Sequence, residues 1–407
     1  MLNGTGTRRL PNWVEGFEEY TEPLYAPALF RKWAAISTIS GVLERKVWTR
    51  TRGKILYPNQ YILLVGPPGA GKGLVLSEII EMWLAVPEFF LAPVSVTKSS
   101  LVDSIHESKR RIVRPTENPP YIEYHALSAA IPEFSDFASM YDPSLMSILQ
   151  SLWDCGYFEE RRRTKDIHLK IVDPVFNFIA GTTPSYLNTF MPEGAWDQGF
   201  AARIMLIFSA ENISVQLFRE VEQREALGDK LKDDLKEIST LYGQAVWTVE
   251  SAKAIQAWVD GGELPLLEHR RLLSYTGRRK AHLIKLCMVA SVARANDLTI
   301  TLEDYQTAIN WMVEAEALMP EIFKAMASGG DSIAIEDTWH FVWRIWTDEN
   351  KPVTEGRIMS FLSERIPAYN VKNVLELMVR SNLLQIHAVE GYGKTTYKPV
   401  PKNLQAR

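Results

Sequence analysis

The chain contains 407 residues, of which 46% are hydrophobic and 23% charged, and its formal net charge at pH 7 is −4. This length suffices for two or three domains, and the charge excludes a protein that is basic throughout, so that contact with nucleic acid requires a local cationic patch. Cys155 and Cys287 are too few for a disulfide framework or a structural zinc site, and we expect reduced, buried thiols. No apolar run approaches the ~20 residues that span a bilayer, and the N-terminus has no secretory signal, which predicts a cytoplasmic protein without membrane contact.

The N-terminal elements lead to a glycine-rich turn. Apolar spacing predicts a helical segment over residues 1–46, and residues 47–65 have the composition of two strands joined by a turn near residues 57–59. The second strand, residues 61–65, is followed by the turn and then by a helix to about residue 83. The turn and the first helical residues are Gly66, Pro67, Pro68, Gly69, Ala70, Gly71, Lys72, Gly73 and Leu74.

This strand–turn–helix pattern predicts a phosphate-binding loop, or P-loop. Glycines let backbone amides approach a triphosphate, the helix N-terminus attracts anions, and Lys72 reaches the terminal phosphates. An ordinary Gly/Pro-rich turn leaves Lys72 unexplained. Gly73 departs from the pattern, because a serine or threonine here normally holds Mg²⁺. ATP and Mg²⁺ are therefore the expected ligands, and nucleotide binding is a stronger inference than hydrolysis.

The buried strand predicted over residues 124–131 ends in an acid. Glu133 occupies the place of a residue that polarises the attacking water, whereas Pro132 stands where a Mg²⁺-organising aspartate is expected. The alternative is that Glu133 only caps the helix that begins near Phe134. An acid at the carboxyl end of a strand faces the ligand crevice of a parallel sheet, and this favours the catalytic role.

A charged segment follows the helix predicted over residues 144–153. Flanking alternation around a polar middle predicts a β-hairpin between residues 157 and 171. Its cations are Arg161, Arg162, Arg163, Lys165 and Lys170. They are candidates for holding the phosphates of single-stranded DNA without reading its sequence. A solvated charged turn is the alternative.

Two further strands carry polar residues at an end. The strand over residues 175–181 leads to Thr182 and Thr183, either of which can hydrogen-bond a γ-phosphate or the attacking water; a simple Thr-Pro turn is the alternative. Arg203 lies on the strand predicted over residues 202–208 and suits an arginine finger that stabilises a transferring phosphoryl group in a neighbouring subunit. Strands that alternate with helices over residues 47–212 predict a parallel sheet.

The rest of the chain has mainly helical patterns. Within residues 213–328, Arg278 and Arg279 open a helix from which one of them can close on the nucleotide, with surface ion pairs as the alternative. Ser328-Gly329-Gly330 predicts a linker. Residues 329–407 predict three helices and a two-stranded wing, a winged helix that binds either duplex DNA or another protein. Its candidate contact residues are Lys372, Asn373, Arg380, Lys394 and Lys398.

The order of these motifs resembles AAA+ ATPases, and more closely the replication proteins of phages and prophages in which Asp-Gly, a basic hairpin and Gly-x-x-Pro follow one another. This chain has Trp153-Asp154-Cys155-Gly156, then residues 157–171, then Gly181-Thr182-Thr183-Pro184. The resemblance covers about residues 13–320. It implies an α/β fold of AAA+ type, with a P-loop ATPase core and parallel central sheet (47–212), a helical lid (213–328) and a C-terminal winged helix (329–407).

The resemblance also implies roles for single residues. They are phosphate contact for Lys72, general base for Glu133, sensor 1 for Thr182 or Thr183, arginine finger for Arg203 and sensor 2 for Arg279. In ring-shaped helicases of the papillomavirus and MCM kinds, a hairpin inserted at this point lines the pore and grips one DNA strand. Gly73 and Pro132 depart from the family, so that water would replace both metal ligands or hydrolysis would be slow.

We therefore expect an ATP-dependent DNA translocase or replicative helicase of phage type that works as a homo-oligomeric, hexameric ring together with other replication proteins. The first alternative is a replication initiator or helicase loader that uses ATP as an assembly switch. The second is a structural or regulatory protein that binds ATP without hydrolysing it.

Overall fold

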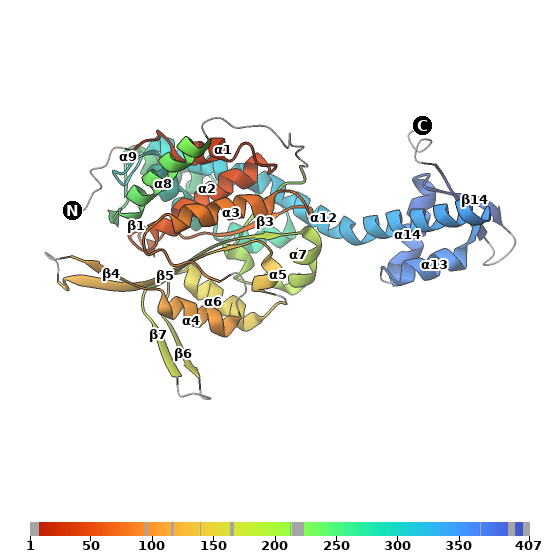
Figure 1. The fold of residues 1–407 in the computed structure, drawn as a ribbon, viewed down its shortest axis with the longest axis horizontal. Helices are drawn as coiled ribbons and strands as arrows, with labels where there is room; N and C mark the ends of the chain where they lie inside the picture. The colour runs from red at the N-terminus through yellow and green to blue at the C-terminus, as the bar shows by residue number, and fades with distance from the viewer. Residues whose placement is uncertain are drawn as a thin grey trace. The chain divides into compact units, whose positions relative to one another are not determined.

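The computed structural model describes residues 8–93, 97–114, 118–138, 140–162, 167–211, 213, 224–366, 368–389 and 395–401. The chain forms two compact units, residues 1–322 and residues 323–407. The first unit is built around a five-stranded sheet, and the second packs helices against a three-stranded sheet (Figure 1). The expected α/β class is confirmed at this level.

The central sheet has the strand order β4-β5-β8-β3-β9. Its members are β3 (Tyr61–Val65), β4 (Lys109–Val113), β5 (Tyr121–Ile131), β8 (Pro174–Thr182) and β9 (Met205–Phe208). Ile62 of β3 lies between Ile179 of β8 and Met205 of β9 in parallel register, and β5 is parallel to β8. Only β4, at one edge, runs antiparallel to its neighbour β5 among these pairs. The carboxyl ends of the four parallel strands therefore lie together at one end of the sheet, where ligands bind in sheets of this kind.

Helices cover both faces of this sheet, which explains why β3 and β8 are buried along their whole length. Figure 1 shows α2 (Ala28–Leu43) and α3 (Lys72–Leu84) on one face, and α5 (Phe134–Phe137) and α6 (Pro143–Trp153) on the other. Asn177 of β8 faces the first layer, where its amide donates to the Ser37 carbonyl of α2 at 3.4 Å. Phe178 faces the second layer and stacks with Phe134. Side chains thus alternate between the two layers along β8.

The other elements of the first unit surround this core. They are α1 (Trp13–Tyr20), β1 (Val47–Arg50), β2 (Ile55–Leu56), α4 (Lys98–Glu107), β6 (Phe158–Arg162), β7 (Ile167–Ile171), α7 (Pro184–Phe190), the 3-10 helices η2 (Glu193–Ala195), η3 (Ala201–Arg203) and η4 (Arg270–Leu272), α8 (Arg224–Ser239), β10 (Gly243–Gln244), β11 (Val246–Trp247), α9 (Val249–Asp260), α10 (Leu273–Thr276), α11 (Arg279–Arg294), β12 (Thr299–Ile300) and the first part of α12 (Leu302–Glu349). Several helices begin at a side-chain cap, as the sequence dictates locally: Asn12 caps α1, Thr97 caps α4 and Asp142 caps α6.

Most predicted elements of this unit are present, with three corrections. Residues 109–112 belong to strand β4 and not to a helix, because the edge of β5 supplies their backbone partners. The first predicted strand is divided into β1 and β2 by a turn at residues 51–54, while residues 57–60 separate β2 from β3 near the expected position. Arg203 ends the short helix η3, and the strand that follows begins only at Met205.

The predicted linker at residues 328–330 is also wrong as a break in the chain, since its backbone lies inside α12, Leu302–Glu349. The two compact units divide earlier, between Ile322 and Phe323. A glycine costs a helix only about 1 kcal/mol relative to alanine, and long helix-forming flanks on both sides outweigh that cost.

The second unit contains the end of α12, followed by β13 (Val353–Thr354), α13 (Glu355–Ser363), α14 (Ala368–Arg380), β14 (Leu384–Val389) and β15 (Thr395–Pro399). Its sheet has the order β13-β15-β14, and β14 and β15 form the predicted antiparallel pair. The core joins Trp339 and Val342 of α12 to Ile358 of α13 and Met378 of α14. The tryptophan-rich segment of α12 thus contributes to packing.

Both cysteines are buried and not disulfide-bonded, as expected. Within the described ranges, no helix combines the length and apolar content that crossing a membrane requires.

Candidate functional site

The predicted P-loop joins the carboxyl end of β3 to the first residue of α3, and its glycines meet specific backbone demands. Gly69 and Gly71 have φ angles of 80° and 74°, a region that residues with a side chain rarely adopt. A Cβ at Gly71 would also lie 2.2 Å from the carbonyl oxygen of Tyr25. The close approach of the loop to the segment before α2 therefore requires glycine, independently of any ligand.

Lys72 is the first residue of α3, and its side chain is buried, with 6% exposure. Its ammonium donates to the carbonyl oxygens of Gly66 at 2.9 Å and Pro67 at 2.8 Å. Burial lowers the Lys72 pKa, and the nearby charge of Glu133 partly offsets this effect. No carboxylate forms an ion pair with Lys72 in the described part of the chain. A desolvated cation held only by carbonyl dipoles beside a helix N-terminus is an attractive position for phosphate oxygens.

Glu133 lies just past the carboxyl end of β5 and is exposed. It occupies the N-cap position of α5, but its side chain makes no capping hydrogen bond. The capping alternative therefore does not account for the carboxylate. Its negative charge acts on Lys72, where it opposes the lowering of the Lys72 pKa by burial.

Gly181 of β8 separates the Lys72 and Glu133 segments. A Cβ at Gly181 would lie 2.4 Å from the carbonyl oxygen of Pro132 and 3.4 Å from the Lys72 Cβ. Only a glycine lets the ends of β5, β8 and α3 approach this closely. The carboxyl edge of the sheet thus brings Lys72 and the Pro132–Glu133 segment together around the end of β8.

The structure distinguishes the two threonines that the sequence left as equal candidates. Thr182 is one residue beyond Gly181, and strand alternation turns its side chain towards the layer of α5 and α6. It is 1% exposed, and its hydroxyl has no hydrogen-bond partner. Thr183 has extended backbone angles (φ −110°, ψ 154°), so its side chain returns to the Gly181 face. Its hydroxyl accepts from the Tyr186 amide at 3.2 Å as the N-cap of α7, which leaves its proton available to a ligand.

The two positions where the sequence lacks a metal ligand remain without one in three dimensions. A Cβ at Gly73 would meet no atom within 4 Å, so a larger side chain has room there, but glycine offers no oxygen. Pro132 likewise presents only its carbonyl, which faces Gly181. Neither position therefore supplies a side-chain ligand for Mg²⁺.

Arg203 does not join this group. It precedes β9, whose first residue Met205 pairs with Ile62 near the start of β3. Arg203 therefore lies at the amino end of these strands, whereas Lys72 follows their carboxyl end. Its guanidinium is 6% exposed and donates to the Gly199 carbonyl and the Asp154 carboxylate. Within this chain, Arg203 is therefore separated from the loop that ends at Lys72.

Arg279 is also away from Lys72. It is 1% exposed and forms a two-pronged ion pair with Glu316 of α12, at 2.8 and 2.7 Å. Tyr275 donates to the same carboxylate and contacts Met205 at the start of β9. With both prongs engaged inside the helical region, Arg279 does not reach the loop, so the structure does not assemble the expected sensor 2 contact. Arg278 instead pairs with Asp154 at 3.3 Å.

Asp154 contacts two of these arginines, a role that its place in the Asp-Gly motif does not indicate. It binds Arg203 and Arg278, whose guanidinium groups also lie over the Trp153 ring at 5.7 and 5.9 Å. The three charged residues are separated by 49 and 124 positions in the chain. No local signal in the sequence indicates that they meet.

The predicted basic hairpin is present as β6 and β7, with Phe158 opposite Ile171 and Arg162 opposite Ile167. It extends away from the sheet on the side of α4 and α6 (Figure 1). Lys170 is exposed. The backbone at Arg161 and Arg162 is part of β6, whereas Arg163 and Lys165 lie outside the described residues.

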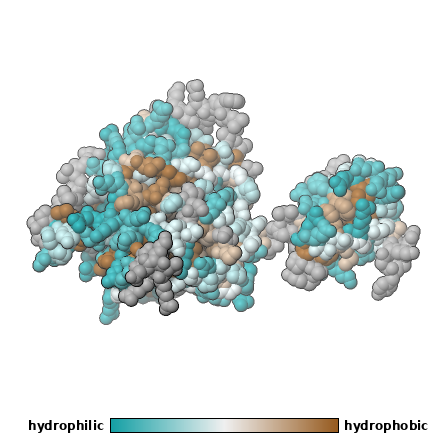
Figure 2. Space-filling view, turned by 60° about the horizontal axis from the view of Figure 1, so that its bottom comes forward, coloured by the Kyte–Doolittle hydropathy of each residue, from teal (hydrophilic) through white to brown (hydrophobic). Residues whose placement is uncertain are grey.

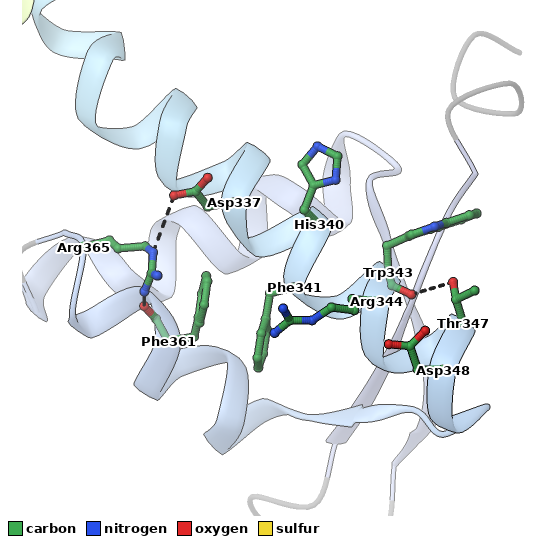
Figure 3. A pocket seen from close by; sticks show the side chains of 9 residues that line it. All are labelled: Asp337, His340, Phe341, Trp343, Arg344, Thr347, Asp348, Phe361 and Arg365. Carbon is green, nitrogen blue, oxygen red and sulfur yellow. Dashed lines mark hydrogen bonds and ion pairs between the residues drawn. The ribbon is translucent and has the colours of Figure 1, made fainter.

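In the second unit, Lys372, Asn373 and Arg380 are exposed on α14, as predicted, and Lys398 on β15 is half-buried. Lys394 lies outside the described residues. An open groove of about 610 Å³ lies beside this unit's core, where Phe341 stacks on Phe361 with ring centres 4.2 Å apart. Figure 3 shows Arg365 next to Phe361, held by an ion pair with Asp337 at 3.6 Å. Mixed charges around two stacked rings do not select one ligand class.

Hydrophobic residues form separate patches among hydrophilic ones on the face shown in Figure 2. No protein-family model matches the sequence, and neither does any curated protein. The functional argument therefore depends on the geometry and chemistry at the two ends of the parallel strands.

Proposed function

We propose that the chain is an AAA+-type ATPase that binds ATP at the loop ending in Lys72 and uses it to translocate on, or unwind, DNA as a hexameric ring. The observation that carries this proposal is the buried Lys72 ammonium, which donates to two carbonyl oxygens. Lys72 follows β3, Glu133 follows β5 and Thr183 follows β8, so all three come after the carboxyl ends of parallel strands. On ATP binding, Lys72 exchanges carbonyl oxygens for phosphate oxygens.

Glu133 and Thr183 then have separate roles at the terminal phosphate. The exposed Glu133 carboxylate is free of the capping role and is the base that polarises the attacking water. The Thr183 oxygen is fixed by the Tyr186 amide, and its proton is free to be donated to that water or to a γ-oxygen. Mg²⁺ supplies charge neutralisation on the phosphates when bound, but the residues at positions 73 and 132 do not hold it.

A shared site between subunits is supported by the placement of Arg203 at the amino end of the strands, whereas Lys72 follows their carboxyl end. Each interface of the ring would combine Lys72, Glu133 and Thr183 of one subunit with Arg203 of its neighbour. Arg203 has to leave Asp154 to act as a finger, so assembly and catalysis are linked through that ion pair.

DNA as the substrate is supported by the projecting hairpin β6–β7, on which Lys170 is exposed. The fold of the second unit, three helices with the β13-β15-β14 sheet, supports a winged helix with α14 as its exposed helix. Lys372 and Arg380 on α14 are then candidates for contacting duplex phosphates.

A second candidate function is a replication initiator or helicase loader. It is favoured by one observation, the absence of an oxygen-bearing side chain at both positions that normally organise Mg²⁺, which suits ATP as an assembly switch better than rapid turnover. A protein that binds ATP without hydrolysis is the limiting case of the same argument.

The proposal is tested with the full-length protein, the Lys72→Ala variant and the matched control Lys230→Ala, which removes an exposed lysine on α8. Binding of fluorescent ATP, hydrolysis with and without single-stranded DNA, and strand displacement are measured. We expect binding and DNA-stimulated hydrolysis in the unaltered and control proteins and loss of both in Lys72→Ala. Hydrolysis without unwinding favours the loader, and ATP binding without turnover favours the third candidate. Equal ATP binding by Lys72→Ala would remove the P-loop argument.

A further inference from the structure

The turn between β1 and β2 is a second concentration of cations that the hairpin β6–β7 does not include. The two strands are antiparallel, with Arg50 opposite Ile55, and the amide and hydroxyl of Thr51 both donate to the Lys54 carbonyl at 2.9 and 3.2 Å. This closes a tight turn. Arg50, Arg52 and Lys54 are all exposed on it. Three positive charges thus occupy five consecutive residues on a fixed backbone.

These three cations form no ion pair within the described ranges, whereas several other surface cations of the unit do. On β4, Lys109 and Arg111 share the Glu123 carboxylate, at 2.8 and 2.6 Å. Like charges on neighbouring positions repel one another. A turn that keeps three of them uncompensated favours a ligand with several negative charges.

Arg45 connects this turn to the base of the hairpin β6–β7. Its guanidinium lies 4.2 Å from the ring centre of Tyr57, the residue after β2. The same group donates to the Cys155 carbonyl at 3.2 Å, just before β6, and to the Asp173 carboxylate at 2.6 Å, just after β7. The two cationic hairpins therefore begin from a common base.

The base of the turn is held from its other side as well. The Thr49 hydroxyl donates to the Ala245 carbonyl and accepts from the Trp247 indole, both at 2.9 Å. β1 also pairs with β10 in parallel register. The turn therefore has a set direction, and its long side chains are the mobile part. Such an arrangement suits phosphates, which require charge but little positional accuracy.

We propose that Arg50, Arg52 and Lys54 form a second binding site for the phosphate backbone of single-stranded DNA, next to the hairpin β6–β7. This inference rests on the proposed function, because it names a further surface for the same substrate. Binding there is independent of sequence, and it lengthens the contact that one subunit makes with the strand. It also gives the strand a grip on a part of the fold that is anchored at both sides.

The test measures binding of a fluorescent thymidine 30-mer by anisotropy over a range of salt concentrations, using the full-length protein. In the triple variant Arg50→Ala/Arg52→Ala/Lys54→Ala, we expect weaker binding and a salt slope smaller by about 2, since each single-strand phosphate contact contributes roughly 0.7 to the slope. Arg50→Lys/Arg52→Lys keeps the charge and should keep the slope. ATP hydrolysis without DNA should be unchanged.

The matched control is Lys230→Ala/Lys236→Ala/Lys253→Ala, which removes three exposed lysines from α8 and α9. It should keep the slope of the unaltered protein, and circular dichroism checks that every variant folds. An unchanged slope in the triple turn variant, with normal binding by the unaltered protein, would overturn this inference and leave the proposed function standing. Equal losses in the turn variant and the control would overturn it too, because only net charge would matter. No DNA binding by the unaltered protein would remove both proposals.

Discussion

Arg203 and Asp154 form an ion pair with 2.5 Å between nitrogen and oxygen, 49 residues apart in the chain. Asp154 ends α6 and directly precedes the segment that enters the hairpin β6–β7. Arg203 lies two residues before β9. The pair therefore joins the proposed finger to the base of the proposed DNA-binding hairpin.

Exchange of subunits tests the role of Arg203 between subunits. Arg203→Ala should bind ATP normally and lower turnover by about 10³-fold, as expected for loss of a finger. Lys72→Ala is inactive for a different reason. Mixing the two inactive proteins should restore part of the turnover, because some interfaces then combine an intact Lys72 with an intact Arg203.

The measurement is phosphate release from mixed samples, with native mass spectrometry to show that mixed rings form. Thermal melting of Arg203→Ala is the control, since the side chain is buried. Mixed rings without recovered turnover would assign Arg203 to the stability of its own subunit.

Gly73→Thr should increase turnover that depends on Mg²⁺. The position is open, so the side chain enters without displacing neighbours, and its hydroxyl supplies the oxygen that the loop lacks. We expect a gain on the order of tenfold, which corresponds to about 1.4 kcal/mol of barrier. Gly194→Thr, also at an open position, is the matched control. The same turnover and the same Mg²⁺ midpoint in Gly73→Thr would show that metal binding at this position does not limit the reaction.

The two threonines should respond differently to removal of their hydroxyl. Thr183→Val loses a cap of α7, worth about 1 kcal/mol of stability, and should also lose most of the turnover. Thr183→Ser should retain both properties. Thr182→Val removes a buried hydroxyl without a partner, so stability should be equal or higher and turnover should change less than twofold. Unfolding curves and ATPase rates decide this, and a reversed order of the two effects would assign the role to Thr182.

Lys285 predicts a rise of stability with pH. Burial lowers its pKa to about 7, although its ammonium donates to Asn59 and Trp153 and lies 3.8 Å from the Trp153 ring centre. Above pH 7 the folded protein has lost a proton that the unfolded chain keeps until about pH 10.5. The free energy of unfolding therefore increases with pH over this window, by up to about 5 kcal/mol in total.

The check is denaturant unfolding at pH 6, 7, 8 and 9. Lys285→Met, which cannot titrate, should show a flatter profile over this range than the unaltered protein. The titration of His282 does not interfere at pH 7–9. Burial lowers the His282 pKa to about 3, so its effect on the free energy of unfolding lies below about pH 6.5. Parallel profiles for the two proteins at pH 7–9 would contradict the assigned pKa of Lys285.

Local chemistry determined much of this protein from its sequence alone. Three features depend only on residues that are close together in the chain. They are the glycine turn that ends at Lys72, the acid that follows β5 and the alternating pattern of the hairpin β6–β7. The same holds for the packed tryptophan segment of α12. Such features depend on the spacing of residues along the chain, which the amino-acid sequence contains.

Tertiary structure alone decided how distant charges are used. Arg279 forms an ion pair with Glu316, and Arg203 forms one with Asp154. Residues 109–113 are a strand because their backbone pairs with β5. Tertiary structure also joined the β1–β2 turn to the hairpin β6–β7 through Arg45. Ion pairs and strand edges form between residues that folding brings within a few ångströms, and separation along the chain contains no information about that distance.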